Sequence, residues 1–168
     1  MKSFQESGKK HLLITGSKKS GKTMILNEIL KEQRGLGGII TDVIRDDKIP
    51  PKYVTLRDRN DPNSGGIIAR RNDSNTSLIP ITETFEVLGR NILKRYIESP
   101  IEVIVIDEIG FLENNAKDYQ NAILNCLEKK KAIFIIKKQK TPLIEQLVNR
   151  QDVYLVDMDE LNRWSVQK

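Results

Sequence analysis

The chain has 168 residues, of which 38% are hydrophobic and 30% are charged, and 28 Lys and Arg against 23 Asp and Glu give a net charge of +5. This length predicts a single domain over residues 1–168. One cysteine, Cys126, and one histidine, His11, exclude an intramolecular disulfide framework, a cysteine-based zinc site and a histidine-rich metal site.

No segment is expected to enter a membrane. The longest apolar runs, at residues 103–106 and 132–136, are far shorter than the roughly 20 residues that a spanning helix needs. Residues 1–10 carry lysines and no apolar stretch, so they are not expected to form a signal peptide. We therefore expect a cytoplasmic protein whose apolar runs are buried strands.

Apolar runs and amphipathic stretches alternate along the chain. In chain order they predict a strand over 11–15, a helix over 22–34, a strand over 38–44, a helix over 82–98, a strand over 102–107, a helix over 118–130, a strand over 132–136, a helix over 142–149 and a strand over 153–156. The Thr82 side chain is expected to cap the second of these helices. Such alternation is typical of an α/β fold with a parallel sheet covered on both faces.

Residues 38–81 interrupt this alternation. Tyr53–Asp58 and Ile67–Arg70 read as short strands, and the segment between them, rich in Asn, Asp, Gly and Pro, reads as a turn. Ser74–Ser77 is expected to be a polar loop. We therefore expect a small, mostly antiparallel insert over residues 38–81 within the single domain.

The strongest motif lies between the first strand and the first helix. Residues 16–23, Gly-Ser-Lys-Lys-Ser-Gly-Lys-Thr, fit the pattern G-x-x-x-x-G-K-[ST] of a phosphate-binding loop. Glycines let backbone N–H groups face phosphate oxygens, and the following helix adds the positive end of its dipole. The candidate nucleotide-binding residues are therefore Gly16, Ser17, Lys18, Lys19, Ser20, Gly21, Lys22 and Thr23.

The side chains of this loop have different expected roles. Lys22 is expected to act in catalysis by placing its ammonium between the β- and γ-phosphates, and the Thr23 hydroxyl to bind Mg²⁺. Lys18 and Lys19 are expected to face solvent, with a second contact to phosphate as the alternative.

A pair of carboxylates directly follows a run of four β-branched residues, Val103–Ile106. In parallel sheets, ligands bind at the carboxyl ends of the strands. Asp107 is expected to hold Mg²⁺, and Glu108 to orient or deprotonate an attacking water as a general base. A glutamate at this position favours a hydrolase, because a kinase needs a second site for an acceptor hydroxyl.

These segments together resemble the THEP-type nucleoside-triphosphatases, a family of P-loop NTPases. The resemblance rests on residues 16–23, 38–42, 66–69, 85–89, 107–113 and 162–163, and Leu112 stands where the family has Met. It implies a three-layer P-loop NTPase sandwich with a mostly parallel central sheet. It also implies Mg²⁺-dependent hydrolysis of nucleoside 5′-triphosphates to diphosphate and phosphate, slowly and with tolerance of the base.

Several further polar residues have open roles. Asn162 and Arg163 are expected to contact the base or ribose from a C-terminal loop, with a plain surface pair as the alternative. Glu113 is expected to cap the next helix or to be solvated rather than to support the site. The candidates for stabilising transition-state charge are Arg57, Arg59, Arg70, Arg71 and Arg150, and no spacing rule selects among them.

Two other classes of function remain open. The first is a small-molecule or nucleotide kinase. The second is a nucleotide-gated module that binds RNA or protein. The lysine clusters at 129–131 and 137–140 are expected to be solvated loop faces, and the nine aromatic residues are not interleaved with them as a base-stacking surface requires. We therefore expect a nucleoside triphosphate as ligand, and neither nucleic acid nor a membrane as partner.

Overall fold

The computed structural model describes residues 2–44, 53–71 and 77–166, with residues 2–3 and 163–166 described by their backbone only. The strands are β1 (His11–Thr15), β2 (Leu36–Ile44), β3 (Tyr53–Asp58), β4 (Gly65–Arg71), β5 (Leu78–Pro80), β6 (Val103–Ile109), β7 (Lys131–Ile136) and β8 (Val153–Asp157). The helices are α1 (Lys2–Glu6), α2 (Lys22–Leu30), α3 (Thr82–Thr84), α4 (Arg90–Glu98), α5 (Lys117–Lys129), α6 (Pro142–Val148) and α7 (Met158–Val166), and a π-helical turn at Phe85–Gly89 joins α3 to α4.

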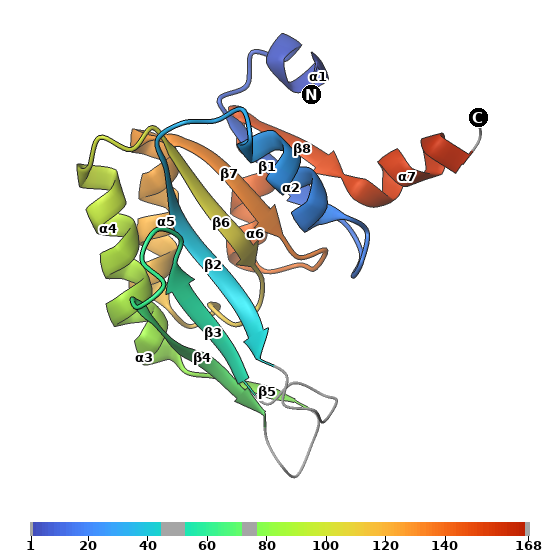
Figure 1. Ribbon diagram of the computed structural model, residues 1–168. Coiled ribbons are helices and arrows are strands. Elements are labelled where there is room, and N and C mark those ends of the chain that lie inside the picture. The colour runs from blue at the N-terminus through green and yellow to red at the C-terminus, as the bar shows by residue number, and fades with distance from the viewer. Residues whose placement is uncertain (1, 45–52, 72–76, 167–168) are drawn as a thin grey trace.

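All eight strands form one sheet in the order β5-β4-β3-β2-β6-β7-β1-β8 (Figure 1). The five strands β2, β6, β7, β1 and β8 are parallel, and β3, β4 and β5 extend the sheet as an antiparallel edge. Strand β7 separates β1 from β6. The loop at the end of β1 and the carboxylates at the end of β6 therefore face each other across the end of β7.

Helices cover both faces of the sheet, as the apolar strands predict. Figure 1 shows α2 on one face and α4, α5 and α6 on the other. Strand β6 divides its side chains between these layers: Val103 and Val105 pack with α2, whereas Ile104 and Ile106 pack with the helices of the opposite face. The expected three-layer α/β sandwich is confirmed. None of the described helices is both long and apolar enough to cross a membrane.

A glycine allows β2 to run close beside β6. Gly38 has φ +136°, and a Cβ there would overlap the carbonyl oxygen of Val105. Residues Leu36–Ile40 pair in parallel with β6, so the insert expected from residue 38 starts inside a strand of the parallel sheet. The antiparallel pairing involves β3 and β4, which match the two short strands expected there. Residues 45–52 and 72–76, including most of the expected polar loop, lie outside the described part.

The helix expected over 82–98 is confirmed over those residues, and it contains a π-helical turn that ends at Gly89. Two local expectations were wrong. Thr82 does not cap the helix that it starts, because Ile81 occupies the cap position and no side chain bonds to the first turn. Residues 162–163 lie within helix α7, not on a C-terminal loop. By contrast, α6 begins as its sequence dictates, with Pro142 in its first turn and the Thr141 hydroxyl accepting the Ile144 N–H at 3.2 Å.

Candidate functional site

The phosphate loop leaves the end of β1 and leads into α2. Gly16 and Gly21 adopt φ of +144° and +94°, in the region that favours glycine, and a Cβ at Gly16 would lie 2.6 Å from the Ser20 hydroxyl oxygen. The Lys22 ammonium donates to the carbonyl oxygens of Gly16 at 2.9 Å and Ser17 at 2.8 Å. It therefore lies over the opening of the loop, where an anion held by the loop's N–H groups would meet it.

The loop lysines behave as expected from the sequence. Lys18 and Lys19 are exposed, and Lys19 adopts a left-handed φ of +66°. Both contribute to the wall of the same cleft as Lys22. The loop therefore offers a cationic surface to an anionic ligand.

The two residues expected to bind metal lie side by side. The Thr23 hydroxyl donates to the Asp107 carboxylate at 3.3 Å. Burial, followed by the negative charge of Glu108, raises the pKa of Asp107 to about 6. A divalent cation between these oxygens would lower that pKa, because it favours the ionised carboxylate.

A threonine on β2 fixes the backbone that carries the carboxylate pair. The Thr41 hydroxyl donates to the Asp107 carbonyl oxygen at 3.1 Å and accepts the Glu108 N–H at 3.1 Å. Parallel pairing places Ile40 opposite Asp107, which brings Thr41 to this position. Sequence reasoning missed Thr41, because its role depends on the register between two strands far apart in the sequence.

Glu108 is paired with a lysine from the end of β7. The Lys137 ammonium lies 3.2 Å from the Glu108 carboxylate, and the Lys137 N–H donates to the Ile109 carbonyl oxygen at 2.8 Å. The sequence predicts a solvated loop face for Lys137, and this prediction is wrong because its ammonium pairs with Glu108. The available signal was its position directly after a buried strand, because the carboxyl ends of parallel strands gather at one edge of the sheet.

Glu113 supports the turn after the carboxylates. Its side chain is buried, and its carboxylate accepts the Gly110 N–H. Burial raises the pKa of Glu113, and the Gly110 N–H partly opposes this rise. The expectation that Glu113 is solvated or caps a helix was wrong, because Ala116 precedes α5 and no side chain caps that helix.

A cleft of about 710 Å³ joins these groups. Its walls are residues 16–24 of the phosphate loop and α2, with Val43, Leu78, Glu108, Lys137, Lys138 and Gln139. A smaller cavity of about 330 Å³ shares Glu108 and Lys137 with it and is also lined by Asp107 and Thr41. The carboxylate pair thus borders a space that can admit water.

Two of the arginine candidates already form ion pairs. Arg57 forms an ion pair with Asp42 at 2.6 Å, and Arg150 forms ion pairs with Asp152 and Glu128 at 2.8 Å each. Burial lowers the pKa of Arg59, and the nearby Asp107 charge opposes this. Among the described residues, the cations that line the cleft are lysines of the loop and of the β7 end.

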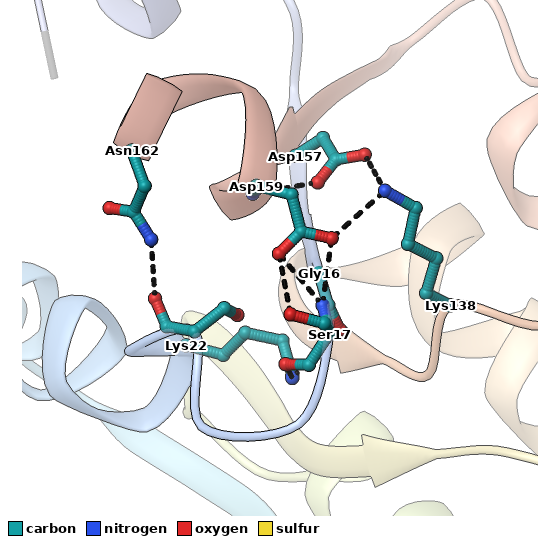
Figure 2. A network of polar contacts seen from close by, with 8 residues as sticks. Gly16, Ser17, Lys22, Lys138, Asp157, Asp159 and Asn162 are labelled. Carbon is teal, nitrogen blue, oxygen red and sulfur yellow. Dashed lines mark hydrogen bonds and ion pairs between the residues drawn. The ribbon is translucent and has the colours of Figure 1, made fainter. Parts of the chain in front are cut away.

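The C-terminal pair is only partly described. The Asn162 amide donates to the Ser20 carbonyl oxygen at 3.2 Å, so it contacts the phosphate loop (Figure 2). The Arg163 side chain lies outside the described part of the chain. Asn162 thus reaches the site from helix α7, which the sequence reading did not anticipate.

The donors suit a hard cation. In the described residues no three His, Cys, Asp or Glu side chains converge as a ready-made metal site. Mg²⁺ usually keeps several waters and binds one or two carboxylates together with substrate phosphates. The hydroxyl of Thr23 and the carboxylate of Asp107 fit that donor set.

Comparison with known proteins adds a family match. A family model described as NTPase matches residues 11–168. Nucleoside-triphosphatase THEP1 of Thermotoga sp. (strain RQ2) is 28% identical over 162 residues, which cover 92% of this chain and 90% of the relative. The protein of the same name from Archaeoglobus fulgidus is 24% identical over 156 residues, with coverage of 89% and 91%.

Two solved structures share the fold. The crystal structure of THEP1 from the hyperthermophile Aquifex aeolicus superposes with a TM-score of 0.70 at 20% identity, covering 88% of this chain and 89% of that one. The solution structure of a human cancer-related nucleoside triphosphatase superposes with a TM-score of 0.65 at 21% identity, covering 88% of each chain.

Proposed function

This chain belongs to the THEP-type NTPase family, and from that premise we propose that it hydrolyses nucleoside 5′-triphosphates to diphosphate and phosphate with Mg²⁺ as cofactor. The observation that carries the proposal is the contact between Thr23, in the first turn of α2, and Asp107, near the end of β6, which lie 3.3 Å apart. It joins a phosphate-binding loop to a carboxylate pair, which is the combination that hydrolysis of a bound triphosphate requires.

Each group has a role that follows from its position. Backbone N–H groups of the loop beyond Ser17 bind the phosphates, and Lys22 turns from the loop carbonyls to the β- and γ-phosphates. Thr23 and Asp107 hold the metal ion, which when bound neutralises charge that develops on the phosphate oxygens. Asn162 and Arg163 contact the sugar or base side of the nucleotide.

Glu108 orients the attacking water and accepts its proton. The water oxygen forms a bond to the γ-phosphorus while the bond from that phosphorus to the β,γ-bridging oxygen breaks. The nucleoside diphosphate is the leaving group. The adjoining cavity of about 330 Å³ supplies space for this water beside Glu108. Lys137, 3.2 Å from Glu108, holds the carboxylate in place beside this space.

Two finer properties follow from the walls of the cleft. The cations there are lysines, which bind phosphate as point charges rather than as bidentate forks, and this supports slow turnover. The cleft has an apolar wall formed by Met24, Val43 and Leu78. These side chains contact a base without forming hydrogen bonds to its polar edge, and this supports hydrolysis of nucleotides with different bases. The free, buried Cys126 suits a reducing compartment, and we place the activity in the cytoplasm.

The test is to identify the products. The purified chain is incubated with ATP, GTP, CTP and UTP, with Mg²⁺ or with EDTA, and both free phosphate and the nucleotide product are measured. We expect each of these nucleotides to give equal amounts of its nucleoside diphosphate and free phosphate. The reaction should occur with Mg²⁺ and not with EDTA. Lys22→Ala should lower the rate about 100-fold or more, whereas the exposed Lys31→Ala serves as the matched control. Phosphate transferred to an acceptor, or turnover unchanged in Lys22→Ala, would overturn the proposal.

A further inference from the structure

The first turn of helix α7 lies against the phosphate loop (Figure 2). The Asp159 carboxylate accepts the Ser17 N–H at 3.0 Å from each of its oxygens, and it accepts the Ser17 hydroxyl at 2.8 Å. The Asp159 N–H in turn donates to Asp157 at 2.9 Å. These hydrogen bonds hold the Asp159 carboxylate at Ser17, the second residue of the phosphate loop.

The same carboxylate holds a lysine from another strand end. The Lys138 ammonium lies 2.7 Å from Asp157 and 2.9 Å from Asp159 (Figure 2). Hydrogen bonds from Lys138, followed by those from Ser17, lower the pKa of Asp159 to about 2. The network therefore keeps a carboxylate ionised and an ammonium oriented beside the loop at neutral pH.

The order of strands in the sheet places Lys138 beside the phosphate loop. Lys138 follows β7, which lies between the strand that ends in the loop and the strand that ends in Asp107. Asp157 pairs with Thr15, the residue directly before the loop. Lys138 also lines the cleft of about 710 Å³ that holds the loop and Glu108. A triphosphate whose terminal phosphate lies near Glu108 would therefore lie within reach of Lys138.

We propose that Asp159 is a positioning residue of the active site, which holds Ser17 and Lys138 so that the Lys138 ammonium contacts the terminal phosphate of the bound nucleotide. This rests on the proposed function, because it assumes a triphosphate in the loop. A free lysine loses much rotamer freedom when it binds a phosphate, and carboxylates that already restrain it reduce that loss. Ser17 keeps Asp159 in place when the phosphate attracts Lys138 away from it.

The loop has other attachments to α7, so the network can be tested without detaching the helix. Asn162 donates to Ser20 at 3.2 Å, and the buried Met158 packs beside Gly16 and Gly21. Lys138 is itself half-exposed. Its replacement removes a charge from the cleft and no part of the hydrophobic core.

The experiment compares Lys138→Met, Asp159→Asn and the double variant. Lys140→Met, on the same loop, and Glu160→Gln, in the same turn of α7, are matched controls because both residues are exposed and neither lines the cleft. Steady-state phosphate release gives kcat and KM. Displacement of a fluorescent ADP by non-hydrolysable ATP gives affinities for triphosphate and diphosphate. Thermal unfolding of each variant checks its fold.

We expect Lys138→Met to lower kcat/KM about 10- to 100-fold and to weaken binding of the triphosphate but not of the diphosphate. Asp159→Asn should act in the same direction to a smaller extent, and the double variant should match Lys138→Met because both changes act through one contact. A merely structural role would weaken both nucleotides equally, and that result would overturn the proposal. Effects that add in the double variant would do the same.

The binding comparison separates this inference from the proposed function. It needs no turnover, so a wild-type chain that binds ATP but releases no phosphate would refute hydrolysis and still allow the test of Lys138. Conversely, normal hydrolysis with wild-type triphosphate affinity in Lys138→Met would refute the inference alone.

Discussion

The Thr23 hydroxyl lies 3.3 Å from the Asp107 carboxylate, although the two residues are 84 positions apart in the sequence. Thr23 lies in the first turn of α2, after the loop that leaves β1, and Asp107 lies near the end of β6. Strand β7 runs between β1 and β6. The contact therefore spans the carboxyl end of β7, where Lys137 and Lys138 emerge. A metal ion at Thr23 and Asp107 would lie between the phosphate loop and the base Glu108.

This relationship predicts how the enzyme depends on Mg²⁺. Thr23→Val and Asp107→Asn should each raise the Mg²⁺ concentration for half-maximal hydrolysis by about tenfold or more, because each removes one oxygen donor. The measurement is phosphate release during a Mg²⁺ titration at saturating ATP. Thr82→Val, at the start of α3, is the control and should leave the titration unchanged. An unchanged titration in both Thr23→Val and Asp107→Asn would exclude this metal position.

The raised pKa of Asp107 predicts a stability change with pH. The folded, metal-free chain holds this proton up to about pH 6, whereas the unfolded chain releases it near the ordinary aspartate pKa of 3.8. Ionisation therefore destabilises the fold progressively as pH rises from 3.8 to about 6, and fully above that. Asp107→Asn should stabilise the metal-free chain by about 1–2 kcal/mol at pH 7, a value reduced for partial exposure, and by nothing at pH 3.

Urea unfolding in EDTA at these pH values checks this prediction. Saturating Mg²⁺ should remove the advantage of Asp107→Asn, because the ion binds the folded wild-type carboxylate. Equal stability of the two chains in EDTA at pH 7 would show that Asp107 is not destabilised by its surroundings.

Replacing Gly38 with alanine, which adds one methyl group, should cause a large loss of stability. Gly38→Ala places a Cβ on the Val105 carbonyl oxygen and keeps an unfavourable φ of +136°. We expect a loss of about 3 kcal/mol or more from the free energy of unfolding. Gly8→Ala is the matched control, since Gly8 has φ +67° with open space around it, and it should cost about 1–2 kcal/mol. Denaturant unfolding that gives equal losses would argue against close contact of β2 and β6.

Two substitutions of Glu113, to alanine and to glutamine, should differ in their effect on stability. Glu113→Ala leaves the Gly110 N–H without its acceptor in a buried turn, at a cost of about 1–3 kcal/mol. Glu113→Gln keeps an acceptor oxygen and should preserve most of the stability and activity. The measurements are thermal unfolding and phosphate release, and equal losses in the two variants would show that the Gly110 contact is unimportant.

Local sequence signals were sufficient for much of the molecule. The glycine pattern of residues 16–23 and the β-branched run before Asp107 each lie within one segment, so periodicity and spacing identify the loop and the carboxylate strand. The family and the α/β sandwich followed from these motifs. The boundaries of helices and strands differ by a few residues, as in α2, which ends at Leu30 instead of residue 34.

The missed features depend on contacts between distant segments. Thr41 contacts the backbone of Asp107 and Glu108 through the register between β2 and β6, and Lys138 lies beside the phosphate loop because β7 runs between β1 and β6. The lysines at 137–140 resemble any solvated cluster until β7 is placed between the loop and Asp107. The sequence did not predict helix α7, because the apolar pattern of the preceding strand β8 carries no information on the structure of the residues after it.

The role of Glu108 is tested most directly by phosphate release from Glu108→Gln at saturating ATP and Mg²⁺, with nucleotide affinity measured on the same preparation. Glutamine keeps the size of the side chain and loses the base. We expect kcat to fall about 100-fold or more with unchanged affinity for ATP, while the exposed Glu83→Gln control keeps the wild-type rate. Wild-type turnover in Glu108→Gln would show that the carboxylate at the end of β6 does not activate the water.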